Sequence, residues 1–424
     1  LAQGYEPTYR TINRFRVHPE VKELIRQCFV QFRCQLVQEE LINQEAIFID
    51  GTKIEANANK FTFVWKKSIE KYHNGLIEKS NQLYNELLEK EIIPEMEWEN
   101  EQELALEDLD QMVKKVDEVI SEYDRKIEDS SDVAERKALR KERKFPKQTR
   151  KQLIDYMERK LKYQRDFEIF DGRNSYSKTD PDATFMRMKD DYMKNGQLKA
   201  GYNIQVATEG QYALAYSIFS NPTDTRTLIP FLDEIEQHYL KLPKHIVADA
   251  GYGSEQNYDD ILVNRKREAL ITYNMYIKEQ RKPYKQNEFN TANWAYDEEN
   301  DRYTCPNQQQ LEFKYRTTKT DKYEYTREFK VYECEDCSGC PLRSFCTKAK
   351  EGTNRKLTVN EKWEQQKEHV RTKLSEEKTS TIYRQRKIDV EPVFGFLKAN
   401  LRFTRFSVRG KSKVDNEMGL ALMA

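Results

Sequence analysis

Residues 47–59 read IFIDGTKIEANAN, a short apolar run that leads directly into Asp50 and then Gly51. The run has the composition of a buried strand, so we expect Asp50 at the carboxyl end of a core strand. A carboxylate at such a place costs free energy unless a positive group meets it. Asp50 is therefore the first candidate for a functional acid, and its partners should lie elsewhere in the chain.

The composition sets limits on the class of protein. The chain has 424 residues, 34% of them charged, and its mean hydropathy is −0.94. Its length favours a core domain with large insertions. No apolar run reaches the roughly 18 residues of a membrane helix, so no membrane partner is expected. Lys plus Arg and Asp plus Glu both number 72, so binding to a polyanion would use local patches.

A second acid occupies an equivalent place later in the chain. Two strand patterns, at 201–209 and 212–220, are separated by Gly210 and Gln211 and predict a hairpin. A helix follows, with Thr223 or Asp224 able to cap its start. The stretch KHIVADAGYG is then another apolar strand that ends at Asp249. This order predicts an α/β fold with a mixed sheet, and Asp50 and Asp249 are expected to face one pocket.

A long charged segment separates these strands. Its first arm is acidic and its second basic, with Ser130, Ser131 and Asp132 as the expected turn. Opposite charges on neighbouring antiparallel helices favour a helical hairpin or coiled coil. Such a segment is more often a solvated insertion than a DNA-binding arm.

The third candidate acid is Glu391, within YRQRKIDVEPVFGFLKANLRFTRFSVRGKSK. Basic residues surround it, with aromatic residues between them, as a groove for a phosphate backbone requires. The alternative is a solvated basic surface. The candidate DNA-binding residues are Arg386, Lys387, Lys398, Arg402, Arg405, Arg409, Lys411 and Lys413.

With these motifs in order, the chain resembles bacterial insertion-sequence transposases of the DDE class, which have a ribonuclease-H-like core. The matching stretches are FIDGTKIEANANKFTFVWKK, TDPDATFMRMKDDYMKNGQLKAGYNIQVAT, PTDTRTLIPFL, VADAGYGSEQNY and RKIDVEPVFGFLKANLRFTRFSVRGK. The resemblance implies Asp50, Asp249 and Glu391 as the catalytic acids. The family often has Tyr and Arg before the Glu; here Lys387 takes the Arg position and Tyr383 lies one residue too far upstream.

The resemblance also implies the chemistry. Carboxylate oxygens suit Mg²⁺ or Mn²⁺, and two such ions would assist strand cleavage and strand transfer on DNA. The implied partners are transposon ends and target DNA, with a homodimer in the synaptic complex, in the bacterial cytoplasm near the nucleoid. An N-terminal truncation is expected as well, since only TYRTINRFRVHPEVKELI remains of the usual DNA-binding helices.

Five cysteines crowd into a short region and predict one structural Zn²⁺. Three alternatives concern this region: Cys305 replacing a later ligand, an iron–sulfur cluster, and free core cysteines. The candidate zinc ligands are Cys305, Cys334, Cys337, Cys340 and Cys346.

Two other functions compete with an active transposase. One is a catalytically idle or domesticated DNA-binding relative, and the other is a zinc-dependent RNA-binding module, which leaves the three acids unexplained. The expected divisions are a helical N-terminal remnant (1–45), a first core segment (46–66), a helical hairpin insertion (67–166), a second core segment (167–275), a cysteine-bearing insertion (276–378), and a third core segment with the final helix and a basic tail (379–424).

Overall fold

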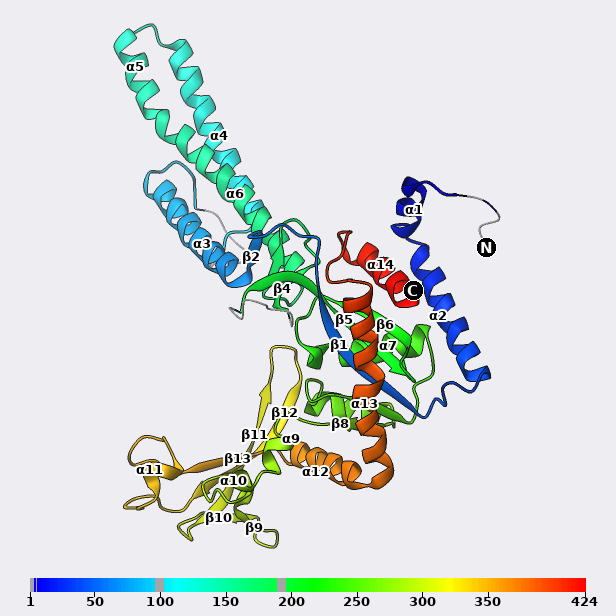
Figure 1. Ribbon diagram of the computed structural model, residues 1–424. Helices are drawn as coiled ribbons and strands as arrows, with labels where there is room; N and C mark the ends of the chain where they lie inside the picture. Colours follow the sequence, from blue (N-terminus) through cyan, green and yellow to red (C-terminus); the bar gives the residue numbers. More distant parts are fainter. Residues whose placement is uncertain (1–3, 5, 96–102, 189–195) are drawn as a thin grey trace. The chain divides into compact units, whose positions relative to one another are not determined.

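The computed structural model describes residues 4, 6–95, 103–188 and 196–424 (Figure 1). Some of the acidic arm, residues 96–102, and residues 189–195 of one family-like stretch lie outside the described residues. The chain forms two compact units, one of residues 1–54 and 202–424 and the other of residues 55–201. The mixture of helices and sheets confirms the expected α/β class.

The main sheet carries the candidate acids. Its strands are β1 (Ala46–Glu55), β4 (Thr184–Arg187), β5 (Leu198–Glu209), β6 (Tyr212–Phe219), β7 (His245–Ala248) and β8 (Glu268–Ile271). The strand order is β4–β5–β1–β7–β8, and β6 also pairs with β5. Strands β1, β7 and β8 are parallel, whereas β5 is antiparallel to β4 and β6. Because β1 and β7 begin as continuous apolar runs, they are buried in the centre of the sheet.

Several helices belong to the first unit. They are α1 (Tyr9–Arg16), α2 (Val21–Gln38), α7 (Leu228–His238), α8 (Glu255–Asp259), α12 (Glu361–Ser375), α13 (Glu377–Gly395) and α14 (Lys411–Met423). Helices α2, α7 and α14 contact β6, α13 contacts β6 and β7, and α12 contacts β8. Helix α14 approaches closely at Gly419, where a Cβ atom would collide with the Tyr216 hydroxyl and with Ile25.

The C-terminal region differs from the expected final helix with a basic tail. Helix α13, which carries Glu391, continues into a π-helical turn, η4 (Phe396–Asn400). A separate helix, α14, then follows and is buried over Val414–Gly419. Asp415 on α14 pairs with Lys22 on α2 at 2.7 Å, which ties the two ends of the described chain together. The sequence did not reveal this helix because its buried positions are partly polar.

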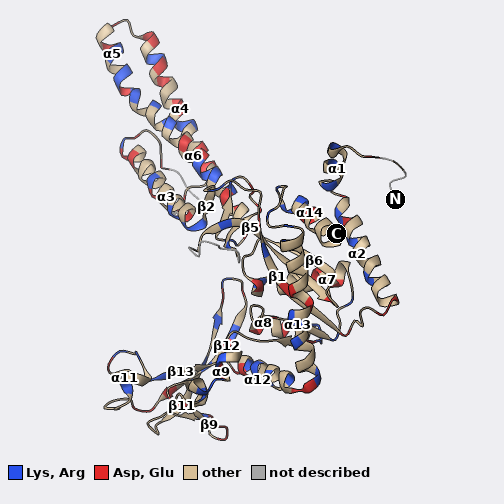
Figure 2. Ribbon diagram, in the orientation of Figure 1, with Lys and Arg blue, Asp and Glu red and all other residues tan. Residues whose placement is uncertain are grey.

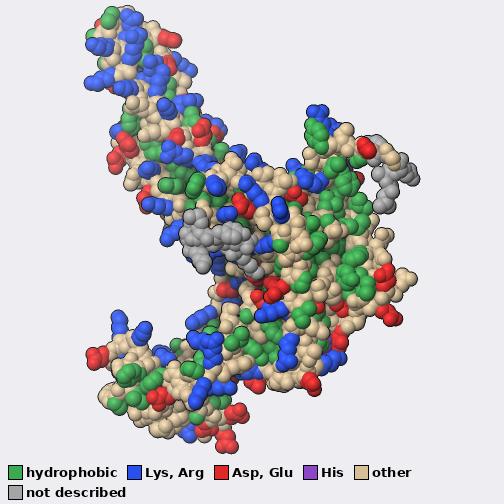
Figure 3. All heavy atoms as spheres, viewed as in Figure 1, with side chains coloured by type: hydrophobic (Ala, Val, Ile, Leu, Met, Phe, Trp, Pro, Cys, Tyr) green, Lys and Arg blue, Asp and Glu red, His purple; other side chains and the backbone are tan. Residues whose placement is uncertain are grey.

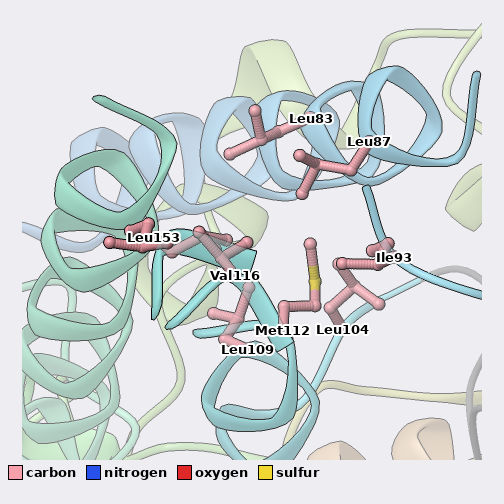
Figure 4. Packing of buried hydrophobic residues seen from close by; sticks show 9 residues of the cluster. Leu83, Leu87, Ile93, Leu104, Leu109, Met112, Val116 and Leu153 are labelled. Atoms are coloured by element: carbon pink, nitrogen blue, oxygen red, sulfur yellow. The ribbon is translucent and has the colours of Figure 1, made fainter. Parts of the chain in front are cut away.

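The second unit is mainly helical. It contains β2 (Phe63–Trp65), α3 (Lys66–Glu89), α4 (Leu106–Asp129), α5 (Val133–Glu142), α6 (Lys144–Phe170) and β3 (Ser175–Ser177). Its helices share an apolar core (Figure 4) of Leu83, Leu87, Ile93, Leu104, Leu109, Met112, Val116, Ile120 and Leu153. Asp132 caps α5 by accepting a hydrogen bond from Ala134 N, so the turn lies where the sequence predicts it. The unit extends beyond the expected insertion, 67–166, on both sides.

A second sheet holds the cysteine-rich region. Its strands are β9 (Ala295–Asp297), β10 (Arg302–Thr304), β11 (Gln310–Thr320), β12 (Thr326–Cys334) and β13 (Lys356–Val359). All neighbouring strands are antiparallel, in the order β13–β12–β11–β10–β9. Three short helices accompany them: α9 (Tyr276–Glu279), α10 (Lys282–Lys285) and α11 (Arg343–Cys346). Among the helices that the structure describes, none is both long and apolar enough to cross a bilayer.

Candidate active site

Asp50 lies in the middle of β1, so the expectation that it ends its strand is wrong. Residues Ala46–Ile49 pair with β7, and Asp50 is the first residue beyond that pairing. The strand continues to Glu55 because β5 lies on its other side. One carboxylate oxygen of Asp50, Oδ1, accepts a hydrogen bond from Gly51 N at 2.7 Å.

Asp249 directly follows β7, as the sequence predicts. Its Oδ1 atom accepts a hydrogen bond from Gly251 N at 2.8 Å. Since β1 and β7 are adjacent and parallel, both acids lie where β7 ends. Figure 3 shows acidic side chains gathered on this unit, with Lys and Arg side chains beside them.

Tyr252 lies three residues after Asp249, and its backbone N–H donates a hydrogen bond to Asp249 O. Its side chain is fully buried, and its hydroxyl donates a hydrogen bond to Gln205 Oε1. Burial raises the pKa of Tyr252, and the negative charges of Asp224, Asp50 and Asp249 raise it further. All three carboxylates therefore raise the pKa of one phenol, two of them predicted from the sequence and one not.

Asp224 is a third acid beside the candidate site, which the sequence suggested only as a helix cap. It begins a 3₁₀ turn, η1 (Asp224–Arg226), and the α7 cap position is Thr227, so Asp224 is not a cap of α7. Instead, Asp224 Oδ1 accepts hydrogen bonds from Asn203 Nδ2 at 2.8 Å and Gln205 Nε2 at 3.1 Å. The signal in the sequence was Asn203 and Gln205, two amides at alternate positions of an otherwise apolar strand.

Two glycines leave the space that Asp224 occupies. A Cβ atom on Gly51 would lie 2.8 Å from Asp224 Oδ1. A Cβ atom on Gly251 would lie 2.9 Å from Asp249 Oδ1 and 3.7 Å from Asp224 Oδ2. Asp224 thus lies between the glycines that follow the two predicted acids, and a side chain at either glycine would press on the carboxylates.

Arg386 supplies the positive charge that Asp50 requires. Its Nη1 atom lies 3.4 Å from Asp50 Oδ2, and each side chain is 14% exposed. The sequence predicts Arg386 as a DNA contact, but in this structure its guanidinium faces the acid. Helix α13 therefore reaches the candidate site through Arg386. Figure 2 colours the basic and acidic positions along this unit of the chain.

Glu391 lies on the same helix, five residues after Arg386, and its side chain is exposed. Within the described residues, the side chain of Glu391 forms no hydrogen bond or ion pair. The described stretches of the chain also contain no group of three or more His, Cys, Asp or Glu side chains arranged to hold a metal ion. The structure therefore brings Asp50 and Asp249 together and does not bring Glu391 to them.

The predicted DNA-binding residues near the C-terminus lie mostly at the surface. Lys387 on α13 is exposed, and Lys398 on η4 is half-buried. The segment between η4 and α14 is anchored by Phe406, whose ring is 2% exposed and packs edge-on against Tyr202. Basic residues on either side of this anchor are exposed. These exposed residues are Arg402, Arg405, Arg409, Lys411 and Lys413.

All five clustered cysteines line one cavity of about 20 Å³, enough for a single water-sized particle. Burial, together with the neighbouring Cys337 thiol, raises the pKa of Cys334 to about 12. Arg355 N donates a hydrogen bond to Cys337 Sγ at 3.3 Å. The structure thus gathers the predicted thiols, although no three of the described ones are arranged as metal ligands.

Residues 304–424 match a family model described as a transposase DDE domain. The matched region includes the cysteines, Glu391 and the basic C-terminal residues, but not Asp50 or Asp249. No curated protein and no solved structure matches the chain. The match supports a DDE transposase, an enzyme class that acts on DNA and generally uses divalent metal ions such as Mg²⁺.

Proposed function

We propose that this protein is a DNA transposase that cleaves and joins DNA strands, with Asp50, Asp249 and Glu391 as its catalytic carboxylates. The observation that carries the proposal is that Asp50 and Asp249, which are far apart in the sequence, directly follow the paired residues Ile49 and Ala248 of two adjacent parallel strands. The match of residues 304–424 to a transposase DDE domain also supports the proposal, because the matched region contains Glu391.

The main sheet supports a ribonuclease-H-like core. Strand β1 carries the first acid, and the parallel strand β7 beside it leads into the second. On the other side, Thr208 Oγ1 donates to Phe48 O, and Ala56 N donates to Ala200 O, so β5 runs antiparallel to β1. An antiparallel hairpin followed by parallel strands is the mixed sheet that the resemblance implies.

The donor set fits a divalent cation in its chemistry. Carboxylate oxygens are the ligands that Mg²⁺ and Mn²⁺ prefer. Asp50, Asp249 and Glu391 would hold two ions, which stabilise charge on the attacking and leaving oxygens of a phosphodiester. The backbone N–H groups of Gly51 and Gly251 each fix one oxygen of their acid, and the other oxygen of Asp50 faces Arg386.

Glu391 enters the proposal through its position on α13. Arg386 on that helix already reaches Asp50. A rearrangement of α13 can therefore move Arg386 and Glu391 relative to Asp50 at the same time. The exposed residues Arg402, Arg405, Arg409, Lys411 and Lys413 provide charge for phosphate contacts on DNA.

Zinc in the cysteine region stays a prediction. The shared cavity and the N–H group that points at Cys337 Sγ support it. On binding zinc, the buried thiols would lose their protons and coordinate the ion as thiolates. The alternative is a small core of free cysteines, since no three of the described thiols are arranged as metal ligands.

An idle DNA-binding relative is the second candidate function. The Asp50–Arg386 pair favours it, because that pair blocks one oxygen of the first acid. A protein of this kind would bind transposon-end DNA but leave its strands intact.

Cleavage of a labelled duplex carrying the element's terminal repeat, in Mg²⁺ or Mn²⁺, tests the function. Asp50→Asn, Asp249→Asn and Glu391→Gln should each abolish cleavage while DNA binding persists. Since members of one catalytic unit fail together, a double variant should be no worse than a single one. Glu377→Gln, an exposed position of α13, is the matched control.

Near-normal cleavage by one of the three variants removes that residue from the site. Binding without cleavage by the unaltered protein, in both metals, supports the idle relative instead.

A further inference from the structure

A cavity of about 800 Å³ opens in the helical unit, between β2, β3, α3 and α6. Its volume lies within the range of small-ligand pockets. Aromatic side chains form much of its lining, and they come from each of these elements. They are Phe63, Trp65, Tyr72, Tyr163 and Tyr176.

The helical repeat explains why these side chains share one space. Ile69 and Tyr72 lie three residues apart on α3, as do Tyr163 and Asp166 on α6, so each pair occupies one helix face. Apolar residues behind them, including Val64 and Phe170, form a small buried core. The cavity is therefore backed by packed side chains.

Two of the aromatic side chains remain open to solvent. Tyr72 is 59% exposed and Trp65 37%. The rings of Phe63 and Trp65 are stacked, with centroids 5.9 Å apart and planes inclined by 13°. Exposed ring faces of this kind are the surfaces on which nucleobases stack.

Asp166 adds a polar group with unused capacity. Its side chain is 6% exposed, and Oδ1 accepts a hydrogen bond from the Tyr176 hydroxyl. The other oxygen, Oδ2, is buried and has no hydrogen-bond partner among the described residues. A buried acceptor without a partner is costly, so a ligand that donates an N–H group at this cavity would recover that free energy.

Two exposed lysines, Lys162 and Lys178, also line the cavity. Their charges suit an anionic ligand, whereas the ring faces suit a flat apolar one. A nucleotide combines both properties, with N–H donors on its base and a negative phosphate.

We propose that this cavity binds an unpaired nucleobase of DNA, stacked on Trp65 and Tyr72, with Asp166 accepting a hydrogen bond from the base. Lys162 and Lys178 then face the flanking phosphates. The choice of DNA as the nucleic acid rests on the proposed function; the stacking site itself rests on the cavity.

The test compares two single-stranded oligonucleotides of equal length and charge, one with all its bases and one with abasic central nucleotides. Fluorescence anisotropy gives both dissociation constants for the full chain in EDTA, so no cleavage is involved. We expect the base-bearing strand to bind at least about fivefold tighter, the lower end of what one stacked base contributes.

Trp65→Ala, Tyr72→Ala and Asp166→Asn should each reduce this ratio toward one. Tyr315→Ala removes an exposed tyrosine on β11, outside the cavity, and should leave the ratio unchanged. Circular dichroism confirms folding, and Tyr72→Ala is the variant least coupled to the core because its ring is the more exposed.

A ratio near one for the unaltered protein overturns the proposal, as does a ratio that survives both aromatic substitutions. Because EDTA removes the catalytic ions, a protein that fails to cleave DNA can still pass this test. A protein that cleaves can likewise fail it, so the two proposals are judged separately.

Discussion

Arg386 on α13 forms an ion pair with Asp50 on β1, with Nη1 and Oδ2 3.4 Å apart. This contact answers the cost of placing a carboxylate inside a core strand, because a half-buried guanidinium offsets the charge. The ion pair also occupies Oδ2 of Asp50, the first candidate metal ligand. Any cation that binds Asp50 through Oδ2 must compete with Arg386.

The first prediction follows from that competition. Arg386→Gln should strengthen Mn²⁺ binding by roughly tenfold, since a hydrogen bond to a charged group contributes about 1.5–3 kcal/mol. Calorimetry without DNA measures the affinity and avoids any role of Arg386 in DNA binding. Lys387→Gln, at the exposed neighbouring position, should change little. An unchanged affinity in Arg386→Gln would show that the ion pair does not obstruct the site.

The second prediction concerns Asp224. Asp224→Ala leaves the buried amide Nδ2 of Asn203 without its acceptor, at about 1–3 kcal/mol for a buried unpaired group, while Gln205 Nε2 keeps its hydrogen bond to Asn203 Oδ1. Asp224→Asn can still accept both hydrogen bonds through Oδ1 and should remain close to the unaltered protein. Urea denaturation gives both free energies of unfolding. Equal losses in the two variants would mean that charge, and not hydrogen bonding, is what Asp224 contributes.

The third prediction concerns DNA binding at the basic C-terminal segment. Replacing Arg402, Arg405 and Lys413 by Gln should lower the salt slope of affinity by nearly one unit per lost phosphate contact. Filter binding at several salt concentrations, with catalysis blocked by EDTA, gives the slope. Lys241, Lys244 and Lys266 form a matched control, because these exposed lysines lie toward the amino ends of β7 and β8. If the salt slope is unchanged in the triple variant, Arg402, Arg405 and Lys413 do not contact DNA.

The fourth prediction is a pH dependence at the β5–β6 turn. Burial raises the pKa of Asp389, and burial followed by the charges of Asp389 and Glu45 raises the pKa of Glu209. Lys378 offsets some of this charge through its ion pair with Glu45. A raised pKa means that the folded state binds the proton more tightly, so stability is full at low pH and falls as pH rises through the raised values.

Asp389→Asn should flatten this fall, because Asn can still accept the hydrogen bond from Gln211 N without carrying a charge. Denaturation at a series of pH values, from below the usual carboxyl pKa up to neutrality, measures the slope. Parallel profiles for the two proteins would show that Asp389 is not the source.

The fifth prediction concerns the cysteine region. Metal analysis of the purified protein should find one zinc per chain, and a chelator should release thiols that then react freely. Cys28→Ser, outside the cluster, is the control for thiol counting. Absence of zinc, with all five clustered thiols reacting at once, would assign the region to free core cysteines.

Much of the fold followed from local pattern. Apolar runs located β1, β7 and the β5–β6 hairpin, because strands buried on both faces have few polar positions. Charge blocks located the helical insertion, since opposite arms favour antiparallel helices. The extent of β1 did not follow, because the polar stretch after Asp50 resembles a turn until β5 pairs with it.

The sequence by itself predicted which residue types a catalytic site would use, namely the two acids Asp50 and Asp249, Glu391 and the basic residues around it. Only the tertiary structure decided which of them meet. Asp224 joins the acids because amides on β5 hold it, and Arg386 pairs with Asp50 because α13 packs across the sheet. Such contacts join residues that lie far apart in the chain, and no local periodicity encodes a distance between them.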